Sequence, residues 1–434
     1  MEVGKSCLYS RRARSGGIHA LSSDLLCRIF GSLDHFDLAR SSVVCKFWYR
    51  TILNSNLWKH LCYKQKQCPV DLSEVHTPNK SWSICLQELA VEQHITYLSA
   101  GFAEVSQWRG HSSGVNVCRM KMGLLLTGVG DKVLRLWSSR NHKCLEEYQV
   151  PDVLPLIDFD FDENKIVGLV GTHVNIWKRQ GKRSILSNKG CVTRTYCMRT
   201  FGVLEMASGL LCSYMDPEAV IGCGDGTVRV FDMYGGRMSR IIRMHHAPVT
   251  CLALTDDQLI VSGSSLGSVS VSDIVSGQDV ASLRRSTATG ISCLSVNPCS
   301  HYVFAGTTSG YAQCWDLRKH QQVWRTRVSP NVLYAMDHLP GDTFCLVVGG
   351  IDGVLRVVSA NSGITLSAFI PGIDTRRDSD DRLVKKFKAK RATEDDLLTI
   401  PRHERPTITC LSVGMHKVAT VHNDKHIMMW RFNC

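Results

Sequence analysis

The chain lacks several features that would assign it at once to a class of protein. Its 434 residues contain no apolar run of about 18 residues, which a membrane-spanning helix requires. No apolar stretch follows the basic residues near the N-terminus, so a secretory signal is not expected. No Cys-X-X-Cys pair occurs among the 19 cysteines, which argues against a zinc ribbon or redox motif. We therefore expect an intracellular protein, cytoplasmic or nuclear or both, with reduced cysteines and no membrane partner.

Signatures of catalysis are also missing. The stretch GCGDGTVRV (222–230) is rich in glycine, but it lacks the Lys-Ser/Thr pair of a phosphate-binding loop. No metal-ligand spacing and no nucleophile motif stands out, so we predict a non-catalytic protein without a metal or other cofactor. The net charge of +12 is compatible with an acidic or phosphorylated partner or with nucleic acid.

From residue 102 onward, one strand-like phrase recurs at intervals of about 40 residues, with two longer intervals. Each copy follows a tight turn and contains an alternating or a continuous apolar run of strand length. The copies are DKVLRLW, GTHVNIW, DGTVRVF, LGSVSVS, SGYAQCW, DGVLRVV and DKHIMMW. Four short strands in about 40 residues are typical of a propeller blade. Seven copies therefore predict a mainly β fold, a seven-bladed β-propeller.

These units resemble the WD40 family over residues 102–434. The resemblance implies a hydrogen-bonded set in blade one, for which we expect a structural role because buried polar groups need partners. The set is His111, Thr127, Asp131 and Trp137. The stretch WDLR also resembles the WDxR motif by which propellers dock on the propeller-type adaptor of another cullin class. Its candidate residues are Trp315, Asp316 and Arg318, and an ordinary blade end is the alternative that we favour.

Three closely similar phrases, VTCLAL (249–254), ISCLSV (291–296) and ITCLSV (408–413), are predicted to form the innermost strands of three blades. VNVCRM (115–120) is a looser version. Small apolar side chains suit the crowded centre of a propeller, so the cysteines of these strands are predicted to be core filler rather than reactive thiols.

The last unit contains only three strands before the chain ends. The extended segment FAEVSQW (102–108) precedes the first unit. We predict that it supplies the missing outer strand, which would leave no unpaired edge where the ring closes.

Two insertions interrupt the repeat. Residues near 196–215 are predicted to form a longer loop, with an ordered hairpin as the alternative. Residues 371–406 are charged and mixed in sign, hence predicted to be mobile above the binding face of the propeller. The second insertion carries a basic cluster of Lys385, Lys386, Lys388, Lys390 and Arg391. The cluster suggests a nuclear-import signal or a patch for an anionic partner, with a solvated loop as the alternative. Phe387 is the only aromatic residue there, so nucleic acid is not the expected partner.

The first hundred residues follow a helical pattern instead. Leu25, Leu26, Ile29, Phe30 and Leu33 have the spacing of one helix face, and two further short helices are predicted before residue 63. This stretch resembles an F-box, with Ser22 where the family usually has proline. The resemblance implies an F-box over residues 18–63, between a flexible segment 1–17 and a helical linker 64–101. The implied adaptor-binding residues are Leu21, Leu25, Leu26, Ile29, Leu38, Val43, Val44 and Cys45, and some of them must belong to the core.

An F-box before a propeller implies the substrate-recognition subunit of an SCF-type ubiquitin ligase. The F-box would dock on the Skp-type adaptor of a cullin–RING ligase, and the propeller would hold a target protein, phosphorylated targets included. The target's lysines would then lie near a ubiquitin-loaded enzyme. Two alternatives remain: a receptor for the other cullin class through the WDxR motif, and a propeller scaffold with no role in ubiquitination.

Overall fold

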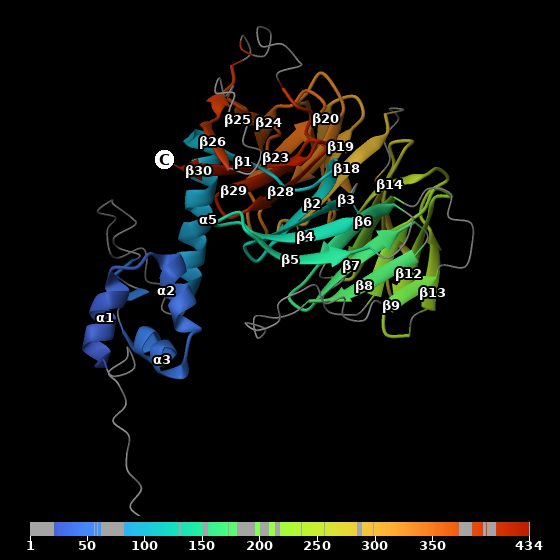
Figure 1. Ribbon diagram of the computed structural model, residues 1–434. Helices are drawn as coiled ribbons and strands as arrows, with labels where there is room; N and C mark the ends of the chain where they lie inside the picture. Colours follow the sequence, from blue (N-terminus) through green and yellow to red (C-terminus); the bar gives the residue numbers. More distant parts are fainter. Residues whose placement is uncertain are drawn as a thin grey trace, which may run out of the picture. The chain divides into compact units, whose positions relative to one another are not determined.

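The computed structural model (Figure 1) describes residues 21–55, 57–58, 60–61, 82–129, 132–150, 155–171, 173–179, 196–199, 208–212, 218–235, 237–255, 257–283, 289–297, 299–372, 384–393, 396 and 405–433. The chain divides into two compact units, Met1–Gln93 and His94–Cys434. The boundary falls within the helix α5 (Trp82–Ala100). Within the described ranges, no helix combines the length and apolar character needed to cross a bilayer.

The described part of the first unit includes the short helices α1 (Ser23–Gly31), α2 (His35–Ser42) and α3 (Lys46–Asn54). Polar side chains begin them: Ser22 Oγ accepts the Leu25 N–H at 3.4 Å, and Asp34 Oδ1 accepts the Asp37 N–H at 2.7 Å. Such caps satisfy backbone donors that have no partner within the helix. The buried core of the unit consists of Leu26, Phe30, Leu38, Ile52, Leu61 and Leu89.

The second unit is a seven-bladed propeller, in which the described residues form seven antiparallel sheets of four or five strands (Figure 1). From inner to outer strand, blades one to three are β2 (Val115–Lys121), β3 (Leu124–Val129), β4 (Val133–Ser138) and β5 (Cys144–Gln149); β6 (Leu156–Phe161), β7 (Lys165–Val170), β8 (His173–Lys178) and β9 (Tyr196–Arg199); and β10 (Ser208–Cys212), β11 (Glu218–Gly222), β12 (Thr227–Asp232) and β13 (Arg237–Arg243).

Blades four to seven are built in the same way, and the last two gain a fifth strand. They are β14 (Val249–Leu254), β15 (Leu259–Ser264), β16 (Val269–Asp273) and β17 (Asp279–Leu283); β18 (Ile291–Asn297), β19 (Tyr302–Thr307), β20 (Tyr311–Asp316) and β21 (Gln321–Arg327); β22 (Leu333–Asp337), β23 (Cys345–Gly350), β24 (Leu355–Ser359), β25 (Thr365–Ile370) and β27 (Lys390–Arg391); and β28 (Cys410–Gly414), β29 (Lys417–Val421), β30 (His426–Asn433), β1 (Phe102–Arg109) and β26 (Lys385–Lys388).

The ring closes as the sequence predicts. The inner strands contact one another in chain order, and β28 of the last blade contacts β2 of the first. In blade seven, β1 pairs antiparallel with β30, from Phe102 opposite Asn433 to Arg109 opposite His426. The two ends of the propeller sequence therefore share one blade, and backbone hydrogen bonds hold the ring shut.

The recurring Thr/Ser-Cys phrase has a structural explanation at the centre of the ring. In blade four, Thr250 Oγ1 donates to the carbonyl oxygen of Ile291 in blade five at 2.6 Å, and Ser292 makes the same bond to Leu333 in blade six. The cysteine that follows packs on a glycine of the next strand, since a Cβ on Gly263 would meet Cys251 Sγ at 2.6 Å. The prediction that these phrases form inner strands is confirmed.

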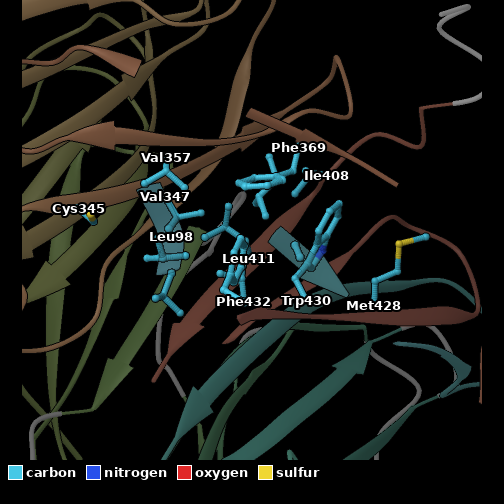
Figure 2. Packing of buried hydrophobic residues seen from close by; sticks show 14 of the residues in the cluster. Leu98, Cys345, Val347, Val357, Phe369, Ile408, Leu411, Met428, Trp430 and Phe432 are labelled. Atoms are coloured by element: carbon cyan, nitrogen blue, oxygen red, sulfur yellow. The ribbon is translucent and has the colours of Figure 1, made fainter. Parts of the chain in front are cut away.

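Among the described residues, the largest buried cluster joins blades six and seven to the end of α5. Figure 2 shows Leu98 of α5 beside residues of β23, β24, β28 and β30. The rings of Phe369 and Phe432 meet edge to face, with centroids 5.3 Å apart. Ser367 Oγ also donates to the Leu98 carbonyl oxygen at 2.7 Å. The last turns of α5 are therefore part of the propeller core.

Both predicted insertions need correction. Residues 196–199 and 208–212 are not an added loop, because they form the outer strand β9 and the inner strand β10. Residues 384–393 of the charged insertion are not a mobile loop above the binding face. They form β26 and β27, which pair with β1 of blade seven and β25 of blade six. The partly buried Phe387 and Ala389 pack on the core cluster, while lysines face outward on a new sheet edge, where charge discourages further pairing.

Candidate functional site

Burial divides the predicted adaptor-binding residues into two groups. Leu26 and Leu38 are fully buried, and Leu21 packs against the same core, so these three hold the first unit together. Leu25, Ile29, Val43 and Val44 are 48%, 44%, 83% and 59% exposed. These four side chains are therefore available to a partner, whereas the core residues are not.

Helical spacing explains the division within α1. Leu26 and Phe30 are four residues apart and point into the core, and Leu25 and Ile29 precede each of them by one position. Residues four apart share a helix face, so one turn of sequence supplies both an inner and an outer apolar pair. Cys45 has a different role, because its Sγ accepts the Trp48 N–H at 3.5 Å and begins α3.

Three further apolar side chains on α3 were not among the predicted residues. Phe47, Tyr49 and Leu53 are 46%, 51% and 58% exposed. Tyr49 and Leu53 follow by one position the core-facing Trp48 and Ile52. The same spacing argument that separates the two faces of α1 would therefore have found them. The exposed apolar side chains of α1, α3 and the segment between α2 and α3 are together called the outer apolar face below: Leu25, Ile29, Val43, Val44, Phe47, Tyr49 and Leu53.

The polar set of blade one is assembled around one hydroxyl group. Arg135 Nη1 donates to His111 Nδ1 at 2.9 Å, which leaves the proton of the neutral ring on Nε2. His111 Nε2 then donates to Thr127 Oγ1 at 2.8 Å, and Trp137 Nε1 donates to the same oxygen at 2.8 Å. Asp131 lies outside the described residues. All three described members of the predicted set are thus joined by internal bonds.

The Trp-Asp pair of blade five is mostly internal. Trp315 is buried, and Asp316 Oδ1 accepts the backbone N–H of Arg318 at 2.8 Å. Arg318 is the accessible member, with 62% of its side chain exposed and its Nε 3.5 Å from Asp316 Oδ1. An ordinary blade end accounts for the first two residues, and the adaptor role of the motif stays a prediction.

The basic cluster lies along the outer edges of blades six and seven. Lys386, Lys388 and Lys390 are exposed, and Lys390 Nζ is 2.7 Å from Asp396 Oδ1. Arg391 is fixed differently, since its Nη2 donates to the Ser99 carbonyl oxygen at 2.9 Å at the end of α5. A cation at a helix C-terminus is favourable. Nuclear import by this cluster stays a prediction.

The centre of the propeller carries charged side chains that link blades one and two. Arg119 Nη2 is 3.0 and 3.2 Å from the two carboxylate oxygens of Asp158, and Lys121 Nζ is 2.7 Å from Asp160 Oδ2. Within the part of the chain that the structure describes, no group of three or more His, Cys, Asp or Glu side chains is arranged to hold a metal ion.

Comparisons with known proteins agree with this architecture. An F-box-like profile matches residues 23–64, and a WD domain, G-beta repeat profile matches residues 277–316, from the end of blade four to Asp316 in blade five. A guanine nucleotide-binding protein subunit beta-like protein 1 of Mus musculus is 25% identical over 152 residues, which cover 34% of this chain and 43% of that protein.

Similarity over nearly the full length is found with an F-box/WD-40 repeat-containing protein of Arabidopsis thaliana. The two are 43% identical over 451 residues, covering 98% of this chain and 96% of that protein. Proteins with this pair of modules are typically non-catalytic adaptors, and the pairing suggests, at the level of the family, a substrate receptor of SCF type. The three helices, the seven blades and this match together show that the chain belongs to the F-box/WD-40 repeat-containing protein family.

Proposed function

We propose that this chain is the substrate-recognition subunit of an SCF-type E3 ubiquitin ligase. Residues 18–63 act as the F-box, residues 64–101 as a linker and residues 102–434 as the propeller that holds a target protein. The outer apolar face docks on the Skp-type adaptor of a cullin–RING ligase. The chain itself supplies no catalytic group, and the target's lysines are modified because they are held near the ubiquitin-loaded enzyme.

One observation carries the docking proposal. The first unit fills its own core with leucine, isoleucine and phenylalanine, yet Val43 and Val44 remain 83% and 59% exposed. Covering each of these side chains with a partner contributes about 1.5 kcal/mol or more to the free energy of binding. Apolar anchors of this kind, at the centre of a contact surface, supply most of the binding energy of protein complexes.

The test is co-purification of the full chain with a Skp-type adaptor. The double variant Val43→Asp/Val44→Asp places two carboxylates on the outer apolar face without touching the core. It should lose adaptor binding while its circular dichroism spectrum stays that of the wild type. Leu266→Asp is the matched control, because Leu266 is 66% exposed in the propeller, and it should bind as the wild type does. Leu26 is a poor choice for this test, since its removal would damage the core.

Retained binding by the double variant would overturn the docking proposal. If the wild-type chain captures no Skp-type adaptor, the propeller-type adaptor of the other cullin class is the next candidate. Binding to that adaptor should then depend on Arg318, whose side chain is the exposed part of the WDxR motif. Arg318→Ala would separate this case from a propeller scaffold that binds neither adaptor.

A further inference from the structure

Two cysteines face each other where the last blade of the propeller meets the first. Cys410 lies on the inner strand β28 of blade seven and Cys118 on the inner strand β2 of blade one. Cys410 Sγ is 3.5 Å from the Cys118 carbonyl oxygen, and Cys118 Sγ is 4.0 Å from the Ala419 carbonyl oxygen of blade seven. The function proposed above uses neither of them.

Among the blades that carry the repeated phrase, two cysteines meet in this way only between blades seven and one. The register of the strands explains why. In blade four, Cys251 lies opposite Gly263, and in blade one Val117 takes the equivalent place opposite Gly128. The cysteine of blade one is thus displaced by one residue, and successive strand residues point to opposite sides. Cys118 therefore points back toward blade seven, with its Sγ 4.0 Å from the Ala419 carbonyl oxygen.

A fixed positive charge adjoins the pair. Arg119 Nη1 is 3.6 Å from Cys410 Sγ, and the bidentate ion pair with Asp158 holds the guanidinium in place. Burial alone would disfavour a thiolate. The hydrogen bond from Cys118 and the Arg119 charge overcome that effect, with Asp158 opposing them, and lower the pKa of Cys410 to about 7. The pKa of Cys118 is raised well above its usual value by its hydrogen bond to Cys410.

The same phrase elsewhere behaves differently and provides an internal comparison. Cys293 occupies the equivalent position in ISCLSV of blade five. It packs between Gly306 of the same blade and Leu333 of blade six. Burial raises its pKa to about 12. The two cysteines at the junction of blades seven and one also differ in their exposure to solvent. Cys410 is partly exposed, whereas Cys118 is fully buried. A small reagent in the channel would reach Cys410 first.

We propose that Cys410 and Cys118 form a peroxide-sensitive dithiol site. The Cys410 thiolate attacks one oxygen of a hydroperoxide, the O–O bond breaks, and Cys410 sulfenic acid and hydroxide (or alkoxide) are formed. The Cys118 sulfur then attacks the Cys410 sulfur and displaces hydroxide, which leaves as water with the Cys118 proton. The thiols lose two electrons in total and the peroxide gains them.

The product is a disulfide across the junction of blades seven and one, which the pairing of β1 with β30 and hydrogen bonds such as Met120 N–H to Ser412 Oγ already hold closed. It would join blade one covalently to blade seven and so stabilise the closed ring of the propeller. The thermal midpoint of the propeller should accordingly rise on oxidation in the wild type, and it should not rise in Cys118→Ser.

The experiment treats the reduced full chain with a small excess of hydrogen peroxide at pH 7 and maps its cysteines by peptide mass spectrometry without reduction. The wild type should yield a Cys118–Cys410 linked peptide. Cys118→Ser lacks the resolving thiol and should instead accumulate Cys410 sulfenic acid, trapped by a dimedone-type probe. Cys293→Ser is the matched control and should form the linked peptide as the wild type does. Arg119→Gln should slow oxidation of Cys410 at pH 7 severalfold and move the midpoint of its rate against pH upward.

Two results would overturn the proposal. One is a wild-type chain in which the exposed Cys144 or Cys299 is oxidised while no linked peptide forms. The other is a Cys410 that reacts no faster than Cys293, which would mean that the Arg119 charge and the Cys118 hydrogen bond do not activate it.

Discussion

The hydroxyl group of Thr127 offers the sharpest test of the polar set in blade one. Thr127 is fully buried, and its oxygen accepts hydrogen bonds from His111 Nε2 and Trp137 Nε1, each at 2.8 Å. Thr127→Val keeps the shape and the β-branch of the side chain but replaces the hydroxyl with a methyl group. Both donors would then remain buried without an acceptor.

The expected cost follows from that count of donors. A buried donor left without a partner costs about 1–3 kcal/mol, and the added methyl recovers part of the loss by packing. We therefore expect Thr127→Val to lower the free energy of unfolding of the propeller by about 2–4 kcal/mol. In a Trp137→Phe background, which lacks the indole N–H, the same substitution should cost about 1 kcal/mol less.

Urea unfolding followed by tryptophan fluorescence and circular dichroism would measure both values. Thr365→Val is the control, because Thr365 is exposed on β25, and surface changes of this kind stay within about 0.5 kcal/mol. A Thr127→Val variant as stable as this control would refute the reasoning that the hydroxyl bridges two buried donors.

Two further predictions concern the outer strand β26 and the end of α5. Phe387→Ser should destabilise the propeller by about 2 kcal/mol and expose the adjacent lysines to trypsin. The control Lys388→Ser, at an exposed neighbouring position, should have neither effect. Equal cleavage of the two variants would contradict the packing of Phe387 on the core. His94 is buried and accepts the His416 N–H at Nδ1, and burial lowers its pKa to about 3. The folded state thus binds fewer protons than the unfolded state below pH 6.5, so stability is lost as pH falls, by up to about 1.4 kcal/mol per pH unit. His94→Gln should reduce that slope in urea unfolding between pH 7 and 5, and an unchanged slope would show that other histidines produce it.

Predictions that depend on periodicity were confirmed by the structure. The seven copies of the strand phrase, the inner position of VTCLAL and ISCLSV, and the closure of the ring by residues 102–108 all follow from patterns that one blade repeats. Such patterns report local burial, and each blade buries its strands in the same way.

The predictions about the two insertions were wrong for the residues that the structure describes. The charged insertion predicts a mobile loop because charged residues of both signs outnumber apolar residues there, yet Phe387 and Ala389, in alternation with lysines, pack against the core cluster. Near residue 200, the long interval between repeats predicts an added loop or an ordered hairpin, whereas the structure has the outer strand β9 of blade two and the inner strand β10 of blade three there. Among the F-box residues, the sequence supplied the apolar set but not its division into core and outer face.

The sequence by itself determined the order of modules, the number of blades and the strand that closes the ring, because these depend on regular spacing along the chain. Only the tertiary structure decided which apolar residues of the first unit face outward, and that the lysine-rich segment is an edge strand of blades six and seven. It also decided that Cys410 differs from Cys293. The two cysteines occupy the same place in nearly identical phrases, and their surroundings differ because Arg119 and Cys118, from the other end of the propeller sequence, lie beside Cys410.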